Sequence, residues 1–203
     1  MNLNEQQVEA IFHINGPLLI LAGAGSGKTR VLTERIANLI SRENVAPYNI
    51  LAVTFTNKAA KEMKERISKR IGEEDTKNIW MGTFHSICSR MLRTDMVLLG
   101  RKSNFVIYDN ADQTKIINDC IKQANLDKET YQANKIINII SKSKSSGYTA
   151  EDYLKKHLSY SDQKIGELFM MYDETLKKNN ALDFDDMLFY VVKILKENPD
   201  RLS

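Results

Sequence analysis

The sequence predicts an α/β protein in which a parallel sheet is interrupted by an all-helical insertion. Apolar runs of strand length alternate with helical patterns over residues 1–108, the order that builds a parallel sheet. A glycine-rich segment at 22–29 separates the first of these runs from the first long helical pattern. Residues 109–181 then carry helical patterns alone, and residues 182–203 form a helix that returns to the α/β part.

Composition agrees with a folded globular chain and excludes few functions. The 203 residues are 42% hydrophobic and 27% charged, and the net charge of +3 is too small to indicate nucleic-acid binding by itself. Cys88 and Cys120 lack metal-ligand spacing, so both are expected to be buried free thiols. The longest apolar run, near 18–22, is too short to cross a membrane, and the N-terminus has no signal-peptide pattern. We therefore expect a cytoplasmic protein with no membrane partner.

Individual elements follow from periodicity and from capping residues. Strands are expected at 17–22, 50–55, 79–83 and 105–108. Helices are expected at 4–13, 28–41, 58–71, from 84, from 110 to 124, around 136–140, after Thr149, from 161 to about 178, and from 183 to 195. The proposed N-terminal caps are Asn4 with Gln7, Thr56, Asn110 with Gln113, Thr149, Ser161 and Asp183.

The glycine-rich segment has the chemistry of a phosphate-binding loop. It consists of Ala22, Gly23, Ala24, Gly25, Ser26, Gly27, Lys28 and Thr29. Glycines let backbone N–H groups curl around phosphate oxygens, Lys28 would reach the outer phosphates, and the Thr29 hydroxyl would hold Mg²⁺. The strict motif has glycine where this chain has Ala22. A chance glycine turn is the alternative, and the Gly-Lys-Thr ending between a strand and a helix disfavours it.

Two further residues could support this loop. The Gln7 carboxamide both donates and accepts hydrogen bonds, which suits an adenine edge, but Gln7 could instead only close a capping box with Asn4. Arg30 could lie near the phosphates or stack on a base, or it could be a solvated helix residue. Spacing favours the capping role for Gln7 and leaves Arg30 undecided.

Polar and aromatic residues follow two of the expected strands. The first junction is Thr54–Ala60, with Phe55, Asn57 and Lys58, and the second is Gly82–Ser86, with Thr83 and His85. Such residues at strand ends suit a sugar–phosphate backbone and a stacked base, although each junction alone could be a capped turn. The acidic run 183–186 is better explained by the helix dipole than by a metal.

Taken together, the motifs resemble those of UvrD/PcrA/Rep-type superfamily I DNA helicases. The matching segments occur in the family order along the whole chain: Leu3-Asn4-x-x-Gln7, 22–29, 54–60, Gly-Thr-Phe-His-Ser at 82–86, and Leu-Asp-Phe-Asp-Asp at 182–186. The resemblance implies a RecA-like P-loop NTPase sheet, here incomplete, with subdomain 1A at 1–108 and 182–203 and the inserted subdomain 1B at 109–181. It also accounts for Ala22, which this family carries.

The resemblance further implies ATP-driven 3′–5′ translocation on single-stranded DNA and unwinding at single/double-strand junctions, in repair or replication. It assigns ATP and Mg²⁺ to the loop, with Gln7 on adenine, Arg30 on the adenine face, and Lys28 and Thr29 on the phosphates and the metal. It assigns the DNA side to Phe55, Asn57, Lys58, Thr83 and His85. It gives no chemical role to 183–186.

The family's Asp-Glu motif and its second RecA-like domain, both needed for rapid phosphoryl transfer, lie beyond residue 203 in the family order. We therefore expect a fragment that depends on the rest of a helicase chain and that hydrolyses ATP poorly by itself. Three alternatives remain: a RecB/AddA-like helicase–nuclease, a nucleotide-gated DNA- or protein-binding module without turnover, and a small-molecule P-loop kinase. The compact insertion disfavours the first, and the two Thr/Phe junctions disfavour the last.

Overall fold

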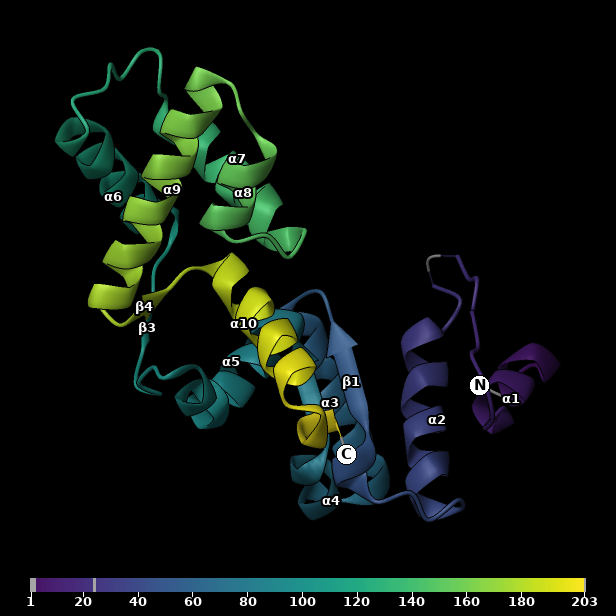
Figure 1. The fold of residues 1–203 in the computed structure, drawn as a ribbon. Coiled ribbons are helices and arrows are strands. Elements are labelled where there is room, and N and C mark those ends of the chain that lie inside the picture. The colour runs from purple at the N-terminus through teal and green to yellow at the C-terminus, as the bar shows by residue number, and fades with distance from the viewer. Residues whose placement is uncertain (1–2, 24, 203) are drawn as a thin grey trace. The chain divides into compact units, whose positions relative to one another are not determined.

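The structure is a computed structural model that describes residues 3–23 and 25–202 (Figure 1). Contacts within the chain divide it into two compact units, unit 1 up to Ile87 and unit 2 from Cys88 onward. This division falls inside helix α5 (Phe84–Asp95). It follows spatial contacts only, so the predicted subdomain boundaries at 108 and 181 stay predictions.

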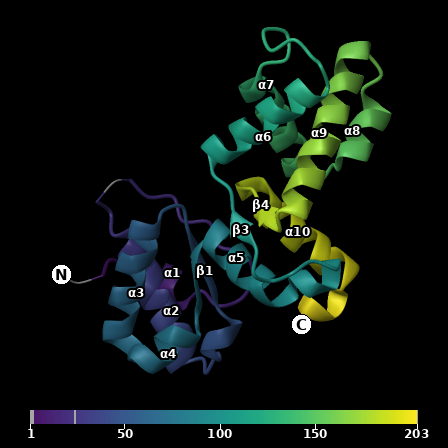
Figure 2. The same ribbon diagram turned by 90° about the vertical axis from the view of Figure 1, so that its left-hand side faces the viewer.

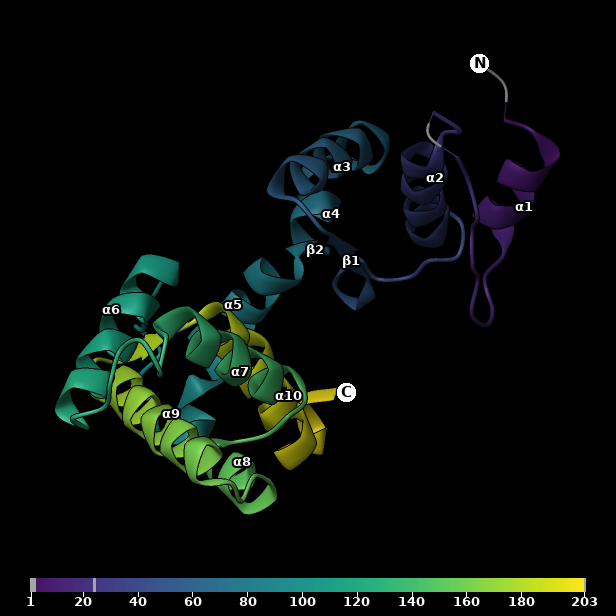
Figure 3. The ribbon, with the colours of Figure 1, turned by 90° about the horizontal axis from the view of Figure 1, so that it is seen from above.

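Unit 1 contains a short parallel sheet covered by helices. Its elements are α1 (Glu5–Phe12), α2 (Lys28–Ser41), the 3-10 turn η1 (Pro47–Asn49), β1 (Leu51–Thr54), α3 (Asn57–Ile71), α4 (Glu73–Asn78), β2 (Trp80–Thr83) and the start of α5. Strands β1 and β2 pair in parallel, with Thr54 opposite Thr83, and α3 crosses between them. Helix α3 packs on both strands, α2 packs on α3, and α1 packs on α2 (Figure 3).

Local signals explain where the helices of unit 1 begin and end. Asn4 caps α1 and forms a capping box with Gln7, and the Thr56 hydroxyl accepts a hydrogen bond from the third residue of α3. Gly72 ends α3 at a φ of +89°, a conformation that glycine adopts without strain. On its inner face α3 buries Ile67 completely. These boundaries were predicted from the sequence and are confirmed.

The strand expected at 17–22 is not formed. Leu19 and Leu21 are 82% and 86% exposed, and the segment forms no ladder with any other described part of the chain. A strand is stabilised by hydrogen bonds to a neighbouring strand and by burial of its side chains, so apolar composition alone does not produce one. The described residues therefore form only short parallel strand pairs, and the predicted RecA-like sheet is not confirmed. Helix α4 was also missed, because its sequence is wholly polar.

Unit 2 is almost entirely helical. After α5 it contains η2 (Met96–Leu99), β3 (Val106–Ile107), α6 (Asn110–Gln123), α7 (Ala133–Ser145), α8 (Ala150–Lys156), α9 (Tyr160–Lys178), β4 (Ala181–Leu182), α10 (Phe184–Glu197) and η3 (Pro199–Leu202). Two-residue strands β3 and β4 pair in parallel, with Val106 opposite Ala181. Figure 2 shows this pair between the α6–α9 bundle and α10. The sequence did not predict β4, which is too short to show a period.

Two hydrophobic clusters stabilise unit 2. The larger one joins α6, α7 and α9, and its side chains Ile117, Ile136 and Leu168 are essentially inaccessible to solvent. The second lies beneath α10 and includes Leu92 and Met187. The buried faces of α6, α7 and α9 agree with the helical patterns in the sequence, whereas Leu188 and Val192 of α10, expected on its buried face, are exposed.

The start of α6 differs from the prediction. The capping box of α6 is formed by Asp109 and Asp112, not by Asn110 and Gln113. Both pairs have the same spacing, but a carboxylate accepts two backbone N–H groups here, a stronger interaction than an amide offers. Helix α7 ends at Ser145, within the polar segment 141–147.

The remaining caps of unit 2 are mostly as predicted. Thr149 and Asp183 each form a capping box, at α8 and α10. Helix α9, however, is capped by Ser159 and not by Ser161, because the Ser159 hydroxyl accepts the N–H of Asp162 and the helix has already begun at residue 160.

Both cysteines are free and buried, as predicted, and burial raises the pKa of each thiol. Among the helices that the structure describes, none is long and apolar enough to cross a membrane.

Candidate functional site

The glycine-rich loop leads directly into α2 and leaves the start of that helix uncapped. Gly25 and Gly27 have φ values of +75° and +87°, in the left-handed region. Helix α2 begins at Lys28, and no side chain caps it, whereas Thr56 caps α3. The first N–H groups of a helix have no partner inside the helix, so a helix start without a side-chain cap suits an external acceptor. Ala24 lies outside the described residues.

The Lys28 ammonium group folds back over the loop. Its Nζ donates to the backbone carbonyl oxygens of Ala22, at 2.5 Å, and Gly23, at 2.9 Å. The side chain is exposed, so an anionic acceptor can replace these carbonyls without disturbing the hydrophobic core. The ammonium group forms stronger hydrogen bonds with an anion than with a neutral carbonyl. Thr29, also exposed, is the second residue of α2. Lys28 and Thr29 therefore both lie where the loop joins α2.

Gln7 combines the two roles that the sequence offered as alternatives. Its Oε1 accepts the N–H of Asn4 at 3.0 Å, which closes the capping box of α1. Its Nε2 donates to the carbonyl oxygen of Ser26 at 3.0 Å, so the same side chain contacts the loop. A Cβ on Gly27 would lie 3.2 Å from this Nε2, so glycine permits the close approach. Whether Gln7 contacts adenine is not tested by this geometry and stays a prediction.

Arg30 is the third residue of α2 and is half-buried. Its position, two residues after Lys28 in the first turn of α2, is compatible with either predicted role, near phosphate or near a base. Its role therefore also stays a prediction.

The two strand-end junctions meet at one edge of the sheet. Because Thr54 pairs with Thr83, the residues that follow β1 and β2 leave the sheet side by side. Phe55 comes directly after β1 and is 96% exposed, an unusual state for an aromatic side chain without a partner surface. Asn57 and Lys58 are exposed in the first turn of α3.

Side chains of the second junction also stabilise the start of helix α5. The Thr83 hydroxyl accepts the N–H of Ser86 at 3.2 Å, and the Ser86 hydroxyl donates to the carbonyl oxygen of Thr83 at 2.9 Å. Thr83 therefore helps to start α5, in addition to any contact with a ligand. Phe84 is 53% exposed and His85 is half-buried. All five residues predicted to contact DNA lie in unit 1.

The loop and this edge face the same way within unit 1. In Figure 1 the N-terminal end of α2 and the arrowhead of β1 lie at the same, upper end of the unit. This is the arrangement of a ligand-binding edge in an α/β protein, where strands end and helices begin. The two junctions, Thr54–Ala60 and Gly82–Ser86, which we call the polar lip, therefore lie at the same end of unit 1 as the start of α2.

The acidic run has a partner that the sequence did not reveal. Asp183 and Asp186 both bind the ammonium group of Lys144, a buried residue on α7. One signal could have identified Lys144: it lies four residues after Ile140 and eight after Ile136, on the same helical face as these buried residues. The described residues contain no group of three or more acidic, histidine or cysteine side chains arranged to hold a metal.

Fold and loop together define an α/β protein of the P-loop class. Comparison with known proteins defines it further, because the model of the UvrD/REP helicase N-terminal domain matches residues 3–203. The chain belongs to this family. It is 46% identical over 202 residues to the ATP-dependent DNA helicase PcrA of Staphylococcus epidermidis and 44% identical to that of Staphylococcus aureus. In both cases the match covers 100% of this chain and 28% of the relative's length.

Proposed function

We propose that this chain is the N-terminal, ATP-binding part of an ATP-dependent DNA helicase that moves 3′–5′ along single-stranded DNA, in DNA repair or replication. Its relatives are named ATP-dependent DNA helicase PcrA, and the chain spans 28% of their length. Helicase activity is accordingly proposed for the full-length protein, in which the remaining chain supplies the second RecA-like domain. Location in the cytoplasm remains a prediction.

One observation carries the proposal: an uncapped, glycine-rich helix start and an exposed aromatic side chain at a parallel strand end lie in the same compact unit. The first feature suits a nucleotide phosphate and the second suits an unpaired base. A motor that couples nucleotide binding to single-stranded DNA needs both. A small-molecule kinase has no use for an exposed Phe55.

On the nucleotide side, the donor set of the loop fits a triphosphate with Mg²⁺. Backbone N–H groups at the start of α2 and the Lys28 ammonium would hold phosphate oxygens, and the Thr29 hydroxyl would be a metal ligand. Gln7, already in contact with the loop, would recognise adenine by hydrogen bonds from its carboxamide to the edge of the base. Arg30 would lie at the adenine face. Bound Mg²⁺-ATP would supply the β–γ phosphoanhydride bond, and its cleavage, with transfer of the γ-phosphoryl group to water, would drive movement.

On the DNA side, Phe55 would stack on a base, while the amide of Asn57 and the ammonium of Lys58 would contact the sugar–phosphate backbone. Thr83 and His85, at the neighbouring strand end, would extend this contact to the next nucleotide. The binding would be largely independent of sequence, because every base has a face for stacking and every nucleotide has a phosphate.

Titration of a fluorescent ATP analogue tests the nucleotide half of the proposal. We expect binding that requires Mg²⁺ and that weakens about 10- to 100-fold in Lys28→Ala, the range for loss of hydrogen bonds to a charged group. Lys61→Ala is the matched control, an exposed lysine on α3 outside the loop. Equal binding by the wild type and Lys28→Ala, or an equal loss in Lys61→Ala, would contradict phosphate binding by this loop.

A further inference from the structure

A buried ammonium group in unit 2 is surrounded by three carboxylates. The Lys144 side chain is 3% exposed, and its Nζ lies 2.7 Å from Asp186, 3.0 Å from Asp183 and 3.1 Å from Asp173. An ammonium group has three N–H donors, so each can be directed to a different carboxylate. We call these four residues the Lys144 cluster.

The Lys144 cluster joins three helices at one point. Lys144 comes from the last turn of α7, Asp173 from α9, and Asp183 and Asp186 from the N-terminus of α10. The Tyr172 hydroxyl adds a hydrogen bond of 2.9 Å to Asp183. The cluster therefore holds the start of α10 at one position against α7 and α9. Hydrophobic packing alone would not impose this position.

The charges of the cluster do not balance. With every carboxylate ionised, three negative charges face one positive charge in a site where Asp183 and Asp186 are 1% and 2% exposed. The other titratable groups facing it are Tyr172 of α9, Tyr190 of α10, Glu151 of α8 and Arg101 before β3. The cavity that Asp173 lines is also lined by Glu174, Lys177, Lys193 and Glu197. Arg101 lies over the Tyr190 ring, and among the described residues the ion pairs of the three carboxylates are made with Lys144.

This excess of negative charge favours the retention of one proton by a carboxylate of the cluster. Burial raises the pKa of Asp186 from its ordinary 3.8 to about 7, with the neighbouring Asp183 and Asp173 adding to the effect against the attraction of Lys144. Burial also raises the pKa of Asp173. Burial by itself would lower the pKa of Lys144, but the three carboxylates outweigh it and hold that pKa well above its ordinary value. Lys144 thus stays charged while a carboxylate titrates.

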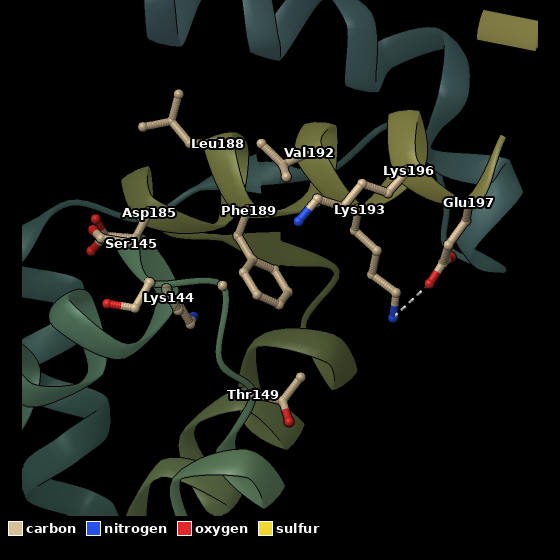
Figure 4. A pocket seen from close by; sticks show the side chains of 12 residues that line it. Lys144, Ser145, Thr149, Asp185, Leu188, Phe189, Val192, Lys193, Lys196 and Glu197 are labelled. Atoms are coloured by element: carbon tan, nitrogen blue, oxygen red, sulfur yellow. Dashed lines mark ion pairs between the residues drawn. The ribbon is translucent and has the colours of Figure 1, made fainter. Parts of the chain in front are cut away.

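Solvent can reach the cluster from two sides. The Asp173 side chain is 33% exposed and lines a cavity of about 530 Å³ together with Arg101 and Tyr190. A second cavity, of about 590 Å³, is lined by Lys144 and by Asp185 and Phe189 of α10 (Figure 4). A proton lost from the cluster therefore has a path to bulk water.

We propose that the Lys144 cluster is a proton-controlled lock that holds α10 against α7 and α9 while one carboxylate is protonated and loosens when that proton is lost to solvent. The site uses neither the nucleotide loop nor the lip, so it is independent of the proposed function. Because Asp186 binds its proton more tightly in the folded state than in the unfolded chain, the stabilisation is complete below about pH 4. It is lost as pH rises toward 7.

Amide hydrogen exchange of the 203-residue chain, measured from pH 5 to 8 and corrected for intrinsic exchange rates, tests the lock. We expect protection of peptides from α10 to fall with rising pH, by at most tenfold per pH unit as one proton is released, and to level off above pH 7. Peptides from α3 in unit 1 should not follow this profile. A flat α10 profile in the wild type would overturn the proposal.

Two carboxamide variants assign the effect to a residue. In Asp186→Asn we expect α10 protection to lose its pH dependence, because the titrating group is gone. Asp185→Asn is the matched control, since its carboxylate lies one residue earlier in the same helix turn and makes no ion pair with Lys144 in the described chain. It should behave as the wild type. A persistent slope in Asp186→Asn, or its loss in Asp185→Asn, would refute the assignment.

A direct titration keeps the test decisive if a variant does not fold. In the wild-type chain labelled with ¹³C at aspartate carboxyl carbons, one resonance should titrate near pH 7, and it should be the one missing from Asp186→Asn. If every aspartate carboxyl titrates below pH 5, no proton is retained and the lock does not exist.

Discussion

Replacing Phe55 with alanine should weaken binding of single-stranded DNA without weakening the fold. The side chain is 96% exposed, so its truncation removes almost no buried surface, and the free energy of unfolding should change by no more than about 0.5 kcal/mol. Stacking of one base on an aromatic side chain contributes about 1–3 kcal/mol. The dissociation constant should therefore rise by about 5- to 150-fold.

Fluorescence anisotropy with a labelled oligothymidine, at one fixed salt concentration, measures this change. Tyr48→Ala provides the control: Tyr48 is 66% exposed in η1, which precedes β1, so it lies at the opposite end of the strand from Phe55. We expect Tyr48→Ala to bind as the wild type. Unchanged affinity in Phe55→Ala, or an equal loss in both variants, would refute base stacking at the lip.

Three further predictions concern salt, nucleotide and packing. Lys58→Ala should reduce the slope of log affinity against log salt for single-stranded DNA by about 0.7, the value for one phosphate contact; an unchanged slope would remove Lys58 from the interface. Lys28→Ala should show the weakened Mg²⁺-dependent binding of the ATP analogue while its far-ultraviolet circular dichroism stays that of the wild type, because the side chain is exposed. Gly166→Ala should lower the free energy of unfolding of unit 2 by about 1–3 kcal/mol in urea titrations, because its Cβ would lie 2.6 Å from Cγ of Leu154; equal or greater stability would show that Leu154 can move aside.

Much of the local structure could be predicted from the sequence. The caps of α1, α3, α8 and α10 depend on side chains that reach the backbone three residues away, and the residue types Asn4, Thr56, Thr149 and Asp183 were sufficient to identify them. The caps of α6 and α9 were placed wrongly by one and two residues. In both cases more than one polar residue near the helix start could serve, and only the backbone path decides between them.

The sheet was less predictable, because strands depend on neighbours that are distant in sequence. The runs at 50–55 and 79–83 became β1 and β2 since each is the other's partner, whereas the equally apolar run at 17–22 pairs with no described segment. The two-residue strand β4 exists only because β3 lies beside it. Apolar composition therefore predicted which segments could be strands and not which of them pair.

The candidate nucleotide and DNA residues could be chosen from the sequence, because the loop at 22–29 and the two junctions are contiguous motifs whose chemistry is local. Tertiary structure alone decided that Thr54 and Thr83 are neighbours and that Gln7 both closes a cap and contacts Ser26. It alone revealed the Lys144 cluster, where Lys144 meets Asp183 across 39 residues of sequence. Periodicity places a residue on a buried face, but a buried charge is tolerated only when folding brings an opposite charge to it.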